Sequence, residues 1–156
     1  MVNYSKIYKK LINWLYIHHN VAVYEANTAD CDGYYNFDTN KKYANITVNK
    51  KVDLKSKIFI ILHEAGHHIL NQESKTKVNL RFSGLCHSRL MRKKSDTVSL
   101  LREEILAWEK GYEISQQLKL YIPWRDYEKE MIKQYWTYIK YISMHWFGGK
   151  KNYSRS

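Results

Sequence analysis

The chain has 156 residues, enough for one ordinary domain and too few for two. Hydrophobic residues make up 44% of it, which argues against a wholly disordered chain, and no apolar run approaches the roughly 20 residues of a membrane-spanning helix. The formal net charge of +11 favours contact with nucleic acid or acidic proteins, unless it reflects only a basic, solvated surface.

Hydrophobic periodicity predicts, in chain order, one helix, three strands and three further helices. The helices are expected over residues 4–19, 54–70, 97–120 and 123–146, and the strands over 21–24, 34–37 and 44–48. Turn residues between the strands suggest a small antiparallel meander. These patterns predict an α+β fold of four helices around a three-stranded, mostly antiparallel sheet, in a single domain over residues 1–147 with a short basic tail over 148–156.

Two cysteines, Cys31 and Cys86, lie far apart and match neither a zinc-ribbon nor a redox spacing. The chain begins without the pattern of a secretory signal peptide. We therefore expect a cytoplasmic protein whose thiols are free.

The sharpest motif is His63-Glu64-Ala65-Gly66-His67, within the predicted 54–70 helix. Helical positions four apart lie about 40° from each other around the axis, so both imidazoles can reach one zinc ion. Glu64 is turned about 100° from His63, beside the ion but outside its ligand set, where it can act as general base toward a water molecule. A surface helix with coincidental histidines is the alternative. His68 is turned away from both ligands and is expected to pack or to support them.

A catalytic zinc site normally has three protein ligands, and the third is expected from the 97–120 helix. Its predicted apolar stripe is Leu101, Ile105, Trp108 and Tyr112. Glu104 borders this stripe, whereas Glu103 falls on the opposite side of the helix. We therefore predict that Glu104 is the third ligand, with Glu103 as the alternative.

These motifs resemble the gluzincin-type zinc metallopeptidases of the ImmA/IrrE family, which are found in bacteria and phages. The resemblance lies in residues 45–49, in 63–70 and in Glu104-x-x-Ala107, and it spans roughly residues 34–120. It implies a minimal zincin fold and a regulatory, often DNA-binding, protein as substrate, in a phage or mobile-element setting. It also implies that the strand holding Ile46 to Val48 pairs with an extended substrate by β-addition.

Three further side chains, His87, Tyr112 and His145, are candidates for stabilising an oxyanion, and the sequence does not choose among them. Residues 74–95 carry seven Lys or Arg and no acidic residue, so they form either a solvated loop or a patch for DNA or an acidic protein. The sequence thus predicts a zinc-dependent peptidase. The alternative is a non-catalytic zinc protein that associates with DNA or a virion, although an intact Glu64 argues against it.

Overall fold

The computed structural model describes residues 2–28, 31–38, 43–73 and 94–146. Their elements in chain order are α1 (Tyr4–His19), β1 (Val21–Ala26), β2 (Gly33–Asp38), β3 (Tyr43–Asn49), α2 (Leu54–Glu73), α3 (Lys94–Gln117) and α4 (Trp124–Trp146). The predicted α+β fold of four helices and a three-stranded sheet is confirmed. Within these described residues, no helix is long and apolar enough to cross a membrane.

Helix α1 shows how local sequence sets the element bounds. The Asn3 side chain accepts a hydrogen bond from the Lys6 N–H at 3.0 Å and caps the start of the helix. At the other end Asn20 adopts the left-handed conformation, with φ of 52°, and its backbone N–H bonds the Leu15 carbonyl. One face of the helix is buried and carries Ile7, Leu11 and Leu15.

The sheet is mixed, in the order β1-β3-β2. Strand β3 pairs in parallel with β1 and antiparallel with β2, so the sheet is not the meander expected from the sequence. Its central position also corrects the expected substrate pairing. Both edges of β3 are already hydrogen-bonded within the sheet, so residues 46–48 have no free edge for an added strand. Among the strands that the structure describes, the free edges belong to β1 and β2.

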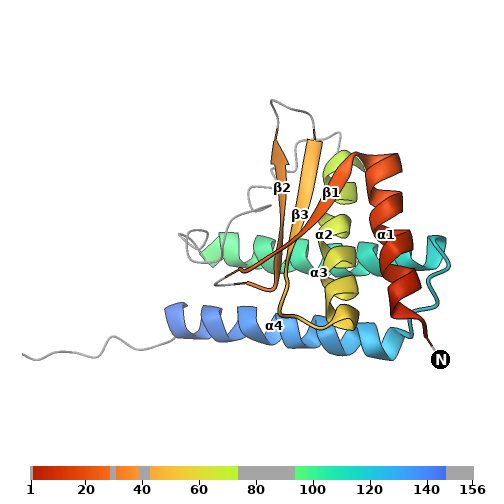
Figure 1. Cartoon of the computed structure of the whole chain (residues 1–156). Helices are drawn as coiled ribbons and strands as arrows, with labels where there is room; N and C mark the ends of the chain where they lie inside the picture. The colour runs from red at the N-terminus through yellow and green to blue at the C-terminus, as the bar shows by residue number, and fades with distance from the viewer. Residues whose placement is uncertain (1, 29–30, 39–42, 74–93, 147–156) are drawn as a thin grey trace, which may run out of the picture.

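Helix α2 is the centre of the molecule. It contacts α1 and the sheet on one side and α3 on the other, and α4 lies along one end of the assembly (Figure 1). Ten consecutive residues, from Lys57 to Gly66, are accordingly buried. Lys57 is tolerated there because its ammonium group pairs with the Glu25 carboxylate of β1 at 2.7 Å. The histidine motif therefore lies on the most enclosed helix of the fold.

Candidate metal centre

Helices α2 and α3 approach closely because both carry small residues at their contact. A Cβ atom on Gly66 would overlap the carbonyl oxygen of Ala107, and one on Gly111 would lie only 2.5 Å from the carbonyl oxygen of Leu62. Backbone therefore lies directly on backbone, which only glycine permits at these two positions. This contact fixes the distance between the histidines of α2 and the glutamates of α3.

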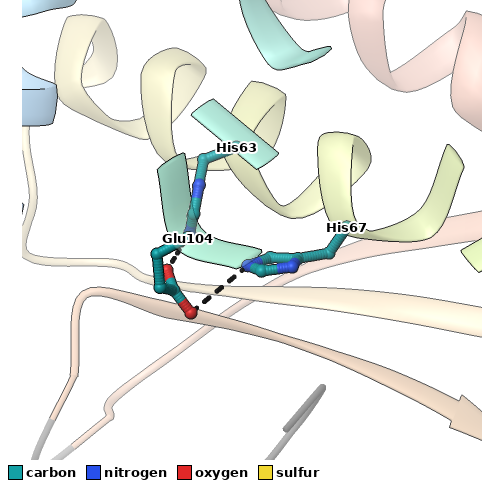
Figure 2. Close-up of side chains that lie close together, drawn as sticks. All are labelled: His63, His67 and Glu104. Carbon is teal, nitrogen blue, oxygen red and sulfur yellow. Dashed lines mark ion pairs between the residues drawn. The ribbon is translucent and has the colours of Figure 1, made fainter. Parts of the chain in front are cut away.

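Three side chains from these two helices converge on one point. Figure 2 shows the rings of His63 and His67 extending from successive turns of α2 toward the Glu104 carboxylate of α3. His63 Nε2 lies 3.1 Å from Glu104 Oε2, and His67 Nε2 lies 3.5 Å from Glu104 Oε1. All three ligand atoms lie within 4.8 Å of one another. Ligands of a tetrahedral zinc ion are separated by about 3.4 Å, as follows from metal–ligand bonds of about 2.0–2.1 Å.

The donor set also suits a cation electrostatically. His63 and Glu104 are buried, and the His67 side chain is only 12% exposed. Within the described part of the chain, the buried oxygen Glu104 Oε2 accepts no hydrogen bond of good geometry, although His63 Nε2 lies 3.1 Å away. A buried carboxylate oxygen without a donor is costly unless a cation binds it. The three residues could therefore hold a metal ion, and their two nitrogens and one carboxylate are the donors typical of a catalytic zinc site.

The charges of the group are strongly coupled. Burial alone would raise the pKa of Glu104, but His67 and His63 outweigh it and hold that pKa well below its usual value. Burial alone would lower the pKa of His67, but the facing Glu104 carboxylate raises it overall. Without an ion, a protonated His67 and an ionised Glu104 thus form an ion pair.

Glu64 lies beside this group and is 8% exposed. Burial raises the pKa of its carboxyl, against the opposing effect of His63 and His67. The carboxylate also accepts a hydrogen bond from the backbone N–H of Tyr35. That N–H belongs to the edge strand β2, so the free edge of β2 lies next to the candidate metal centre. A buried carboxylate beside a candidate cation site is placed as a general base would need to be.

Neighbouring aromatic groups hold the histidine rings in place. The Trp108 ring of α3 stacks on His63 with centroids 4.4 Å apart and an interplanar angle of 21°. His68 points to the sheet instead, where its Nδ1 atom lies 2.9 Å from the Tyr35 hydroxyl. This placement confirms that His68 packs against the sheet, and the group that could hold a metal does not include it.

The structure brings together the predicted residues His63, Glu64, His67 and Glu104. The reasoning that led to Glu104 needs one correction, since Ile105 is 41% exposed and does not belong to the buried stripe of α3. Glu104 is instead inside that stripe, with Leu100, Ala107 and Trp108. Glu103 is only partly buried and belongs to no group that could hold a metal among the described residues.

The three candidates for stabilising an oxyanion are Tyr112, His87 and His145, and the structure describes the side chain of Tyr112 alone among them. Tyr112 is two helical turns beyond Glu104, about 12 Å along the axis, and its ring packs on Trp124 and Tyr127. It is therefore not placed to stabilise an oxyanion at this centre. His87 lies outside the described residues, as does the side chain of His145. Nearly all of the basic segment 74–95 also lies outside them.

Two contributors were missed by sequence reasoning. The Tyr35 backbone of β2 reaches Glu64, and in α4 burial and the nearby charge of Glu104 raise the pKa of the Tyr138 hydroxyl. Tyr138 is a buried side chain of α4. Periodicity assigns it to a buried face but contains no signal that this face meets Glu104.

Comparison with known proteins adds no evidence about the function of this site. No protein-family model, no curated protein and no solved structure matches the chain.

Proposed function

We propose that this protein is a zinc-dependent peptidase that hydrolyses peptide bonds in a protein substrate. One observation carries the proposal. The buried group of His63, His67 and Glu104, from two tightly packed helices, lies beside a second buried glutamate, Glu64, that is not part of the group. A site that served only to hold the fold together would have little need of Glu64.

In this proposal His63, His67 and Glu104 hold the ion. A zinc ion there would polarise the scissile carbonyl and lower the pKa of bound water to about 7. Glu64 takes a proton from the attacking water and later gives it to the leaving amine. The Tyr35 N–H orients the carboxylate by donating to it.

The substrate is proposed to bind in an extended form. Because β3 has no free edge, β-addition would take place on β2, whose Tyr35 lies against Glu64. The similarity of the motifs to ImmA/IrrE peptidases supports a regulatory or DNA-associated protein as substrate, acted on in the cytosol. The basic segment 74–95 would then assist encounter with DNA or with an acidic region of that substrate.

The variant Glu64→Gln tests the proposal. Zinc-loaded wild type and variant are each incubated with a soluble bacterial proteome, and new peptide N-termini are identified by mass spectrometry. Wild type should generate a defined set of new N-termini, and Glu64→Gln should bind zinc equally well but generate none, because only the base is lost. Glu109→Gln, an exposed position on α3, is the matched control and should cleave like wild type. Identical products from wild type and Glu64→Gln would contradict the proposal and favour a non-catalytic zinc protein.

A further inference from the structure

One tyrosine of β2 faces two parts of the molecule at once. Just before β2 begins, the Asp32 carbonyl accepts a hydrogen bond from the Asn49 N–H of β3 at 2.8 Å. In an antiparallel pair the backbone groups of alternate residues point to the same side, so the N–H and carbonyl of Tyr35 point away from β3, toward the free edge. The Tyr35 side chain, in contrast, is buried against α2. This residue thus belongs to the free edge through its backbone and to the helix contact through its side chain.

The Tyr35 hydroxyl is joined to His68 of α2. Its oxygen lies 2.9 Å from His68 Nδ1, and both side chains are buried. The two rings also make an edge contact, with centroids 5.5 Å apart. His68 Nε2 is buried without a hydrogen-bond partner among the described residues, so within this part of the chain the Tyr35 hydroxyl is the polar contact that orients the ring. Because His68 directly follows His67, this bond connects β2 to the turn of α2 that carries a candidate ligand.

We propose that the Tyr35–His68 pair is a clamp that positions the free edge of β2 beside the metal centre for an extended peptide substrate. The inference rests on the proposed function and deepens it, because it assigns residues that position the substrate rather than the zinc ion. The ligands are held by the contact of α2 with α3, in which β2 takes no part. A buried hydrogen bond is costly to break, since its loss leaves a buried polar group unsatisfied. Loss of the clamp should therefore weaken substrate binding and leave the zinc site intact.

Four variants separate the hydrogen bond from the packing around it. Tyr35→Phe keeps the ring and removes the hydroxyl. Tyr34→Phe is the matched control, because Tyr34 is the preceding residue of β2, is 40% exposed and faces the opposite side of the sheet. His68→Leu removes both ring nitrogens, whereas His68→Asn offers an amide group near the position of Nδ1 and can bond the Tyr35 hydroxyl again. The two histidine variants test the clamp independently if Tyr35→Phe folds poorly.

Three measurements are made on the zinc-loaded proteins: zinc affinity by competition with a chromophoric chelator, amide hydrogen exchange by mass spectrometry, and kcat and KM for a peptide that spans one cleavage site of the wild type. Zinc affinity should equal that of wild type in every variant. The amides of β2 should exchange about 5-fold or more faster in Tyr35→Phe and His68→Leu, as expected for the loss of one buried hydrogen bond. KM should rise by a similar factor with little change in kcat, which is the mark of lost substrate binding. Tyr34→Phe and His68→Asn should stay close to wild type.

The outcomes separate this inference from the function on which it rests. Wild-type exchange of β2 in Tyr35→Phe and His68→Leu would overturn the clamp, and so would equal effects of Tyr34→Phe or of His68→Asn. Faster exchange with an unchanged KM would overturn its role toward the substrate. A wild-type protein that cleaves no peptide would overturn the proposed function and with it that role, while the exchange of β2 would still decide whether the clamp exists.

Discussion

Replacing Gly66 by alanine tests the close contact of α2 and α3 on which the ligand geometry depends. The added Cβ would overlap the Ala107 carbonyl oxygen, and would lie 2.9 Å from the Ala107 carbonyl carbon and 3.1 Å from the Gly111 nitrogen. All three are backbone atoms of α3, so no side chain can rotate away to make room. The two helices must therefore move apart.

The magnitude follows from two opposing effects. An alanine in place of a helical glycine normally stabilises a protein by about 1 kcal/mol. Ordinary contacts of a Cβ begin at 3.4 Å, whereas the Ala107 carbonyl oxygen would lie at 2.0 Å, so the contact must open by about 1.4 Å. Overpacking of this kind costs about 3 kcal/mol, at the upper end of its usual range. The net result should be a loss of about 2 kcal/mol. Because His63 and Glu104 lie on different helices, the same shift should weaken zinc binding at least about tenfold.

Urea denaturation of the metal-free protein measures the first quantity and a zinc competition titration measures the second. Ser99→Ala, at an exposed position of α3, serves as control and should change the free energy of unfolding by less than about 0.5 kcal/mol. If Gly66→Ala instead stabilised the protein by about 1 kcal/mol, as at an unconstrained helical position, the close packing of α2 on α3 would be refuted.

Two further predictions concern the ligands. Glu104→Ala should greatly reduce zinc affinity in a chelator competition assay, whereas Glu103→Ala should not, and the reverse result would mean that α3 is rotated by about 100°. Burial lowers the pKa of His67, but the facing Glu104 carboxylate outweighs burial and raises that pKa overall. In the metal-free protein, the His67–Glu104 ion pair should therefore stabilise the fold fully below pH 6.5, the ordinary pKa of histidine. This stabilisation should be lost as the pH rises through the raised pKa of His67. Zinc affinity should increase over the same pH range, because a protonated His67 cannot bind zinc. Thermal unfolding and zinc titrations at a series of pH values measure both trends. A zinc affinity that falls as the pH rises through this range would contradict the prediction.

Much of the site could be predicted because it depends on spacing within helices. His63 and His67 share a face of any helix that contains them, since four residues make just over one turn. The choice of Glu104 over Glu103 used an apolar stripe that includes Trp108, and Trp108 is buried on the same face as Glu104, although Ile105 of that stripe is exposed. Such features are local, and the sequence contains them in full.

The remaining features arise from contacts between distant segments. The parallel pairing of β1 with β3 depends on how α1 and α2 pack beneath the sheet, so the alternation of residues within each strand could not predict it. The exposure of Ile105 has a similar cause, because the contact through Gly66 and Gly111 decides which face of α3 is buried. The proximity of Tyr138 to Glu104 comes from the packing of α4 on α3, and no local pattern encodes the relative placement of these two helices.

The central claim is most directly tested by the metal content of the purified protein, combined with X-ray absorption at the zinc edge. We predict about one zinc ion per chain, with nitrogen and oxygen ligands at about 2.0–2.2 Å and no sulfur. In Glu104→Ala the bound zinc should fall sharply. A wild-type protein without zinc, or a zinc shell that contains a thiolate from Cys31 or Cys86, would contradict the assignment of His63, His67 and Glu104 as the metal centre.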